Sequence, residues 1–213
     1  MNLSSVVDFL SDRLKKPLPG SVAHEPMRAT PVGSIKPKFE HKSPPKPGSV
    51  LILLYEEEGE IRFPLTKRPD YLGTHGGQVS LPGGKKEKGE TEIETALREG
   101  EEEIGIKSSD VKVIGRLSDF FVIPSNFLIA PIVGYVERIP AFTPQQSEVE
   151  RILKGNLDQL IQEDAVHEKE ILAAKMYPMF APHFLIEKEI VWGATAMMLN
   201  ELRVILRERS DFL

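Results

Sequence analysis

The chain has 213 residues, of which 40% are hydrophobic and 28% are charged, so it can bury a substantial core as one domain with an extension. Its formal charge of −5, from 27 basic and 32 acidic residues, argues against an extended nucleic-acid-binding surface. Cysteine is absent, which excludes disulfides, a thiolate zinc site and a cysteine nucleophile.

The N-terminal part is predicted to be a helix followed by an extended arm. Apolar residues recur at helical spacing, which predicts an amphipathic helix over residues 3–16. The sequence Pro-Leu-Pro-Gly that follows should end it. Frequent prolines then deny residues 17–48 a long helix or a central strand. We therefore divide the chain into an N-terminal helix with a proline-rich arm (residues 1–48) and a domain (residues 49–213).

The remainder of the chain mixes short strands with helices. Residues 50–55 form an apolar run typical of a buried strand, and residues 60–66 follow a Glu-Glu-Glu-Gly turn as its hairpin partner. Further strands are predicted at 111–117, 127–136, 148–153, 171–176 and 184–186, a helical turn at 157–161 and a closing helix at 193–207. Pro131 suggests a bulge or a sheet edge in its strand. Intermixed strands and helices indicate the α/β class.

A short two-faced helix is predicted after residue 90. Thr91 and Glu94 have the spacing of a capping box, which places the first turn there. One face gathers apolar and small residues that we expect to be buried: Ile93, Ala96, Leu97, Gly100 and Ile104.

Three carboxylates share the other face of this helix. At about 100° per residue, Glu99, Glu102 and Glu103 fall within about 100° of one another. Carboxylates so close raise one another's pKa unless a cation lies among them. Hard divalent ions such as Mg²⁺ take oxygen ligands of this kind, often alongside substrate phosphates. Taken alone, however, the spacing favours a solvated acidic face, which most Glu-rich helices carry.

The full pattern from Gly84 to Ile106 resembles the Nudix box, the signature of the Nudix hydrolase superfamily. The box reads G-x5-E-x7-R-E-U-x-E-E-x-G-U, with U aliphatic, and every polar and glycine position is matched here. Gly100 departs at the first U position. Because glycine costs a helix up to about 1 kcal/mol relative to alanine, we expect looser packing there. The resemblance implies the Nudix α/β/α sandwich around a mixed β-sheet.

The segment before the box resembles the second signature of the coenzyme A pyrophosphatase branch of that superfamily. Glycine-rich turns let backbone N–H groups approach phosphate oxygens, and neighbouring cations add charge. The predicted substrate-binding residues are therefore Lys67, Arg68, His75, Gly77, Gly83 and Gly84. Four positions depart from the signature: it has leucine at Pro64, serine or alanine at Pro69, arginine at Gly73 and phenylalanine at Leu81.

The resemblance implies metal-dependent hydrolysis of the pyrophosphate bond of coenzyme A or its derivatives, with Mg²⁺ or Mn²⁺ as cofactor. The products would be 4′-phosphopantetheine and adenosine 3′,5′-bisphosphate. The implied metal ligands are Glu99, Glu103, Glu102 and the carbonyl of Gly83.

The remaining box residues have supporting roles under this reading. Arg98 is expected on the flank of the helix, where it can bond Glu90 or a metal ligand and hold the carboxylates in place. Glu90 either closes the turn before the helix or binds the metal itself. Glu148 completes the predicted catalytic set as general base, although an exposed glutamate in such a loop is more often inert. Trp192 could contact the substrate or be plain core.

Two other functions stay open. One is a Nudix hydrolase of another nucleoside diphosphate derivative, such as ADP-ribose or NADH, which the departures at residues 73 and 81 favour. The other is a nucleotide-binding module without catalysis, although such modules can lose carboxylates that this chain retains. The expected partner is a small-molecule nucleotide, with no nucleic acid and no membrane. The arm also makes a homodimer conceivable.

A cytoplasmic protein is the simplest prediction. No run approaches the roughly 18 consecutive apolar residues that a membrane-spanning helix needs. Asp8 and Asp12 interrupt the N-terminal apolar residues, where a signal peptide would need an unbroken segment. The C-terminal Ser-Asp-Phe-Leu also differs from a peroxisomal Ser-Lys-Leu signal.

Overall fold

Two β-sheets with helices against them make up the fold, in a computed structural model that describes residues 2–33, 39–70 and 76–209. The helices are α1 (Leu3–Arg13), α2 (Ser21–His24), α3 (Glu92–Ile104), α4 (Leu157–Leu160) and α5 (Gly193–Leu206). The strands are β1 (Thr30–Pro31), β2 (Lys46–Glu57), β3 (Glu60–Lys67), β4 (Val79–Ser80), β5 (Gly83–Lys85), β6 (Lys112–Arg116), β7 (Phe120–Val122), β8 (Phe127–Tyr135), β9 (Arg151–Asn156), β10 (Val166–Ala173), β11 (Tyr177–Ile186) and β12 (Glu189–Trp192).

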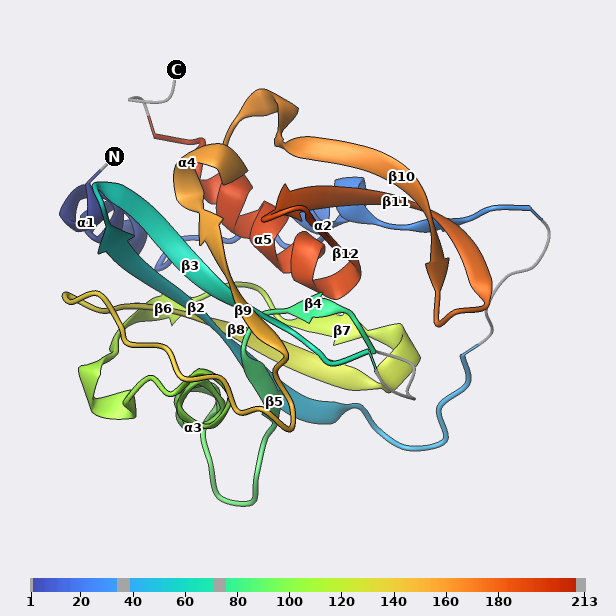
Figure 1. Cartoon of the computed structure of the whole chain (residues 1–213), viewed down its shortest axis with the longest axis horizontal. Coiled ribbons are helices and arrows are strands. Elements are labelled where there is room, and N and C mark those ends of the chain that lie inside the picture. The colour runs from blue at the N-terminus through green and yellow to red at the C-terminus, as the bar shows by residue number, and fades with distance from the viewer. Residues whose placement is uncertain (1, 34–38, 71–75, 210–213) are drawn as a thin grey trace.

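Strand β2 is the centre of the larger sheet (Figure 1). It runs parallel to β8 on one side, while on the other side it pairs antiparallel with β3 and with β5. From β3 the sheet continues to β4 and β9, and from β8 to β6 and β7. The mixture of parallel and antiparallel pairs, with helices between them in sequence, confirms the α/β class.

Both faces of β2 are covered. Successive side chains of a strand point to opposite faces, and a run of consecutive residues in β2 is buried. Ile52 and Leu54 belong to the core cluster that contains α1 and α5 residues. Leu51 and Leu53 belong to a second cluster around α3. Helices α3 and α5 therefore lie on opposite faces of the sheet, as Figure 1 shows, which is the predicted α/β/α sandwich.

Helix α3 begins where its sequence predicts. The Thr91 side chain accepts from the Glu94 N–H, and the Glu94 side chain accepts from the Thr91 N–H, so the capping box is confirmed. Ile93 was expected in the core but is 43% exposed. Ile93 lies in the first turn of α3. The spacing of apolar residues predicts which way its side chain points, but not whether the core extends far enough to cover that turn.

Gly100 does not loosen the packing of α3, contrary to expectation. A Cβ at this position would lie 2.9 Å from Cδ2 of Leu51 and 3.4 Å from Cγ2 of Ile106. The glycine instead lets the helix approach β2 closely.

Pro131 was predicted to mark a bulge or a sheet edge, but it lies inside β8, an internal strand, and the register shift of this strand pair lies between Val113 and Gly115 of β6. On the side where β8 pairs antiparallel, β6 reaches Ile132 and β7 reaches Ile129, so the neighbouring strand is interrupted opposite the proline. The carbonyl of Pro131 accepts a hydrogen bond from Leu117 N–H in that interval (2.9 Å). An interrupted neighbour requires no N–H from Pro131, which explains why proline is tolerated there.

The smaller sheet is built on a long hairpin of β10 and β11, where the sequence predicted two short strands. Strand β11 also pairs with β1 and β12. Residues 167–170 of β10 are polar and exposed, so they gave no hydrophobic alternation from which to recognise the strand. Strand β9 likewise starts at Arg151 and not at residue 148.

A carboxylate buried on α5 binds the N-terminal arm. Glu201 is fully buried and accepts hydrogen bonds from Gly20 N–H (3.0 Å) and from the Ser118 hydroxyl (2.6 Å). Its Oε2 lies 3.0 Å from Nε2 of His24. Burial raises the pKa of Glu201, but these hydrogen bonds outweigh it and leave the pKa below its ordinary value. The division of the chain at residue 48 stays a prediction.

Replacing Glu201 by glutamine is expected to lower the free energy of unfolding by about 3 kcal/mol, because donors buried around it lose their charged partner. Since folding lowers the pKa of Glu201, its contribution is present above the unfolded pKa and is lost as the pH falls through the folded value. Urea unfolding at neutral pH and at pH values below 4.5, the ordinary pKa of glutamate, measures both effects. The control is Glu208→Gln, which breaks a more exposed pair with Arg13 and should cost under about 1 kcal/mol. Equal losses for the two variants would contradict the anchoring role.

None of the helices within the described residues is long and apolar enough to span a membrane.

Candidate active site

The acidic face of α3 lies against β5. Glu103 is 4% exposed, and its Oε2 accepts a hydrogen bond from Gly83 N–H (3.2 Å). The Glu99 side chain is 14% exposed. The Glu102 side chain, three residues further along α3, is 59% exposed. The helix and strand thus hold two glutamates in a largely buried position.

Two glycines make room for this arrangement. A Cβ on Gly84 would lie 2.5 Å from Oε1 of Glu99, where the carboxylate now sits. A Cβ on Gly83 would lie 2.6 Å from Cα of Val50 in the neighbouring strand. The Gly-Gly pair is therefore required by the close approach of β2, β5 and the glutamates.

The electrostatics of the two buried glutamates are unfavourable for their charged forms. Burial raises the pKa of Glu103 to about 7, although the Gly83 N–H and the charge of Arg68 act in the opposite direction. Burial also raises the pKa of Glu99, against the effect of Arg98. The negative charge of Glu148 adds to both shifts, which places that side chain near the pair.

Arg98 connects the acidic residues on the flank of α3. Its Nη1 lies 3.0 Å from Oε1 of Glu99 and 2.9 Å from Oε2 of Glu102. Its Nε donates to Oε1 of Glu90 (2.6 Å), and Nη2 donates to the carbonyl of Lys85 (3.1 Å). The guanidinium therefore ties both glutamates to the loop before the helix.

Glu90 closes the turn that precedes α3. Besides Arg98, it accepts hydrogen bonds from Glu87 N–H (2.9 Å) and from the Thr95 hydroxyl (2.8 Å). The Arg98 hydrogen bond, with help from these donors, lowers the pKa of Glu90 to about 2. Of the two roles left open for Glu90, these contacts favour the turn.

The loop that carries Glu148 is fastened to the site at both ends. Gln145 N–H donates to the carbonyl of Glu103 (3.0 Å), and Glu150 N–H donates to the carbonyl of Lys67 (2.9 Å). Between these bonds, Glu148 is exposed and close enough to influence the charges of both buried glutamates.

The predicted substrate-binding residues separate into distinct places. Lys67 points towards β12, where its Nζ bonds Oε1 of Glu189 (3.0 Å). Arg68 is exposed, its charge acts on Glu103, and its N–H donates to the carbonyl of Gln78 (3.0 Å). His75 lies outside the described residues, as does residue 73.

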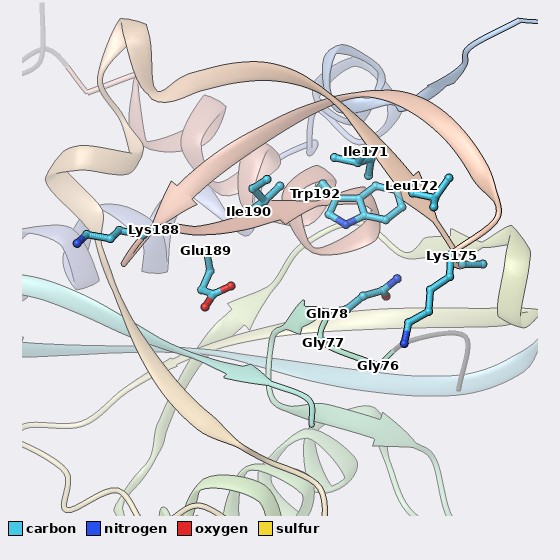
Figure 2. Close-up of a pocket in the computed structure, with 11 residues that line it drawn as sticks. Gly76, Gly77, Gln78, Ile171, Leu172, Lys175, Lys188, Glu189, Ile190 and Trp192 are labelled. Carbon is cyan, nitrogen blue, oxygen red and sulfur yellow. The ribbon is translucent and has the colours of Figure 1, made fainter. Parts of the chain in front are cut away.

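Sequence reasoning missed a hollow of about 300 Å³, the hairpin pocket, which opens beside this segment (Figure 2). Its lining comes from the turn before β4, the end of the β10–β11 hairpin and β12: Gly76, Gly77, Gln78, Ile171, Leu172, Ala174, Lys175, Lys188, Glu189, Ile190 and Trp192. Two signals in the sequence pointed here, the predicted substrate-binding residue Gly77 and the isolated tryptophan. Trp192 is only partly buried, so it is not plain core.

The donor set fits a divalent cation, although no cage is pre-assembled. Among the described residues, no three His, Cys, Asp or Glu side chains already form a group that could hold a metal ion. Arg98 bridges Glu99 and Glu102, and Gly83 N–H binds Glu103. Carboxylate oxygens are nevertheless the ligands of hard cations, and a cation would stabilise the charged forms of these two glutamates, whose pKa values burial raises.

Comparison with known proteins gives consistent matches. The family model described as NUDIX domain matches residues 45–183. Nudix hydrolase 22, chloroplastic, of Arabidopsis thaliana is 35% identical over 173 residues, which cover 78% of this chain and 57% of that protein. Nudix hydrolase 3 of Caenorhabditis elegans is 34% identical over 173 residues, covering 74% of this chain and 72% of its own. The crystal structure of the MutT protein from Methanosarcina mazei Go1 superposes with a TM-score of 0.51 at 18% identity, over 80% of this chain and all of that one (100%).

Proposed function

Because this chain belongs to the NUDIX domain family, we propose that it is a metal-dependent hydrolase of the pyrophosphate bond in nucleoside diphosphate derivatives. The observation that carries this proposal is the pair of buried glutamates, Glu99 and Glu103, held against Gly83 and Gly84, where burial disfavours their charged forms unless a cation binds them. A diphosphate also needs cations to offset its own charge, so one site would meet both needs.

Members of the family generally use divalent metal ions. When bound, such an ion lowers the pKa of a water ligand and polarises phosphoryl oxygens. Glu99 and Glu103 would hold it, with Glu102 beside them and the Gly83 carbonyl as a further oxygen donor. We favour Mg²⁺ or Mn²⁺, since both accept oxygen ligands.

The surrounding residues would orient this site. Arg98 restrains Glu99 and Glu102 through its hydrogen bonds, and Glu90 fixes Arg98 in turn. Arg68 offers positive charge on the side of Glu103, where a substrate phosphate would come. Glu148 is the candidate general base, because it is an exposed carboxylate on the loop fastened beside the buried pair and its charge acts on both members.

Coenzyme A or a derivative is the substrate that the segment from Leu65 to Gly84 supports, through its similarity to the coenzyme A pyrophosphatase signature. A panel of coenzyme A, ADP-ribose and NADH with Mg²⁺ tests this. We expect coenzyme A to have the highest kcat/KM, with 4′-phosphopantetheine and adenosine 3′,5′-bisphosphate as products. A preference for ADP-ribose or NADH would overturn the substrate assignment only. Hydrolysis of none would favour a non-catalytic binding module. A cytoplasmic location and a homodimer stay predictions.

Gly84→Ala is expected to weaken metal binding about tenfold, because the added methyl group would occupy the place of the Glu99 carboxylate. A calorimetric titration with Mn²⁺ measures the affinity directly. The control is Lys85→Ala, which shortens the exposed neighbouring side chain and leaves the backbone carbonyl that Arg98 uses. Unchanged Mn²⁺ affinity in the Gly84 variant would show that Glu99 is not a ligand.

A further inference from the structure

Apolar side chains and glycine backbone line the hairpin pocket. Ile171, Ile190 and Trp192 are paired with alternate residues of β11, so their side chains share one face of the smaller sheet. Gly76 and Gly77 lie opposite and present backbone without side chains (Figure 2). The pocket therefore offers a planar group an indole, aliphatic side chains and open glycine backbone in one lining.

Two of the three charged side chains that line the pocket, Lys175 and Glu189, have partners of opposite sign. Glu189 is paired with Lys67 (3.0 Å) and Arg151 (3.1 Å). Lys175 at the hairpin turn is paired with Asp70 (3.2 Å). Lys188, the third, points away from Trp192 and the glycines (Figure 2). The space beside Trp192 therefore suits an uncharged aromatic ring better than a phosphate group, which needs unmatched donors.

Arg68 links the pocket to the acidic face of α3. Gln78 lines the pocket, and its carbonyl accepts the N–H of Arg68 (3.0 Å). The charge of Arg68 in turn acts on Glu103. The Arg68–Gln78 backbone pair thus links the pocket to the neighbourhood of Glu103, so a group attached to a diphosphate held there could extend towards the pocket.

We propose that the hairpin pocket binds the aromatic base of the nucleotide substrate, stacked on Trp192. The inference rests on the proposed function only in taking the ligand to be a nucleoside diphosphate derivative. A base stacks on an indole at little entropic cost, since both rings are rigid. A pantetheine chain has no ring and would have to order many rotatable bonds in the same space.

Trp192 is the only tryptophan of the chain, so its fluorescence reports on this pocket alone. The metal-free protein is titrated with adenosine 5′-monophosphate, with ribose 5-phosphate and with 4′-phosphopantetheine. We expect saturable quenching by adenosine 5′-monophosphate and none by the other two compounds. Absence of that quenching, or equal quenching by 4′-phosphopantetheine, would overturn the proposal.

Calorimetry with adenosine 5′-monophosphate separates stacking from a structural role of Trp192. We expect Trp192→Leu to weaken binding about tenfold and Trp192→Phe to retain most of the affinity. The matched control is Phe180→Leu, which removes an exposed ring outside the pocket lining and should leave binding unchanged. Equal losses for Trp192→Leu and Phe180→Leu would refute base stacking. Because this binding needs no turnover, it can succeed even where every diphosphate substrate fails to be hydrolysed.

Discussion

Replacing Glu103 by glutamine is expected to lower kcat/KM about a thousandfold while the fold persists, since a metal ion contributes several kcal/mol of charge stabilisation. The amide keeps an oxygen that can accept the Gly83 N–H, but it loses the charge that would hold the cation. Steady-state hydrolysis of coenzyme A at saturating Mg²⁺ measures the loss.

Glu101→Gln is the matched control for this substitution. Glu101 lies on the same helix but is exposed, and it bonds Ser108 at the far end of α3 (2.7 Å). Its replacement should leave kcat/KM unchanged. Full activity of the Glu103 variant would mean that the metal site lies elsewhere.

The Glu103 substitution is also expected to stabilise the metal-free protein at neutral pH. Burial raises the pKa of Glu103 from 4.5 to about 7, so the folded chain binds the proton more tightly than the unfolded chain. The ionised carboxylate therefore costs free energy, which is absent below the unfolded pKa, grows between the two values and reaches roughly 3 kcal/mol above the folded one. Thermal unfolding with a chelator, at mildly acid and at neutral pH, measures the gain. A gain of equal size at both would contradict this cause.

The box helix could be predicted from the sequence because its determinants are local. The Thr91–Glu94 capping box and the shared face of Glu99 and Glu103 follow from spacing within one element. The spacing of residues along a helix does not reveal how closely that helix packs against the sheet. For that reason Gly100 was predicted to loosen the helix, whereas the Leu51 side chain of β2 packs so close to it that a Cβ would not fit.

The remote parts of the site could not be predicted in this way. Lys67 was assigned to phosphate, but its partner is Glu189, far along the chain, on a strand that the sequence did not reveal. The place of Trp192 in a pocket with Gly76 and Gly77 depends on the β10–β11 hairpin, which the sequence did not predict in full. Such contacts depend on which strands meet and in which register, and local patterns do not encode this.

Glu148→Gln is expected to lower kcat a hundredfold or more, because a positioned general base contributes about 10²–10⁴ to the rate. The amide cannot take a proton from the attacking water. Since Glu148 is proposed as a base and not as a ligand, the affinity for Mn²⁺ should stay unchanged. Turnover at saturating metal and Mn²⁺ calorimetry therefore distinguish the two roles.

The neighbouring Glu150 supplies the control for this prediction, because it is exposed on the same loop and its backbone N–H keeps the loop bonded to Lys67. Its side chain reaches only to 4.0 Å from the Lys67 Nζ. Glu150→Gln should therefore retain wild-type kcat, which shows that a change of charge on the loop is not enough to stop the reaction. If excess metal restored the Glu148 variant, that side chain would act through the cation, and the base would have to be sought within the box helix.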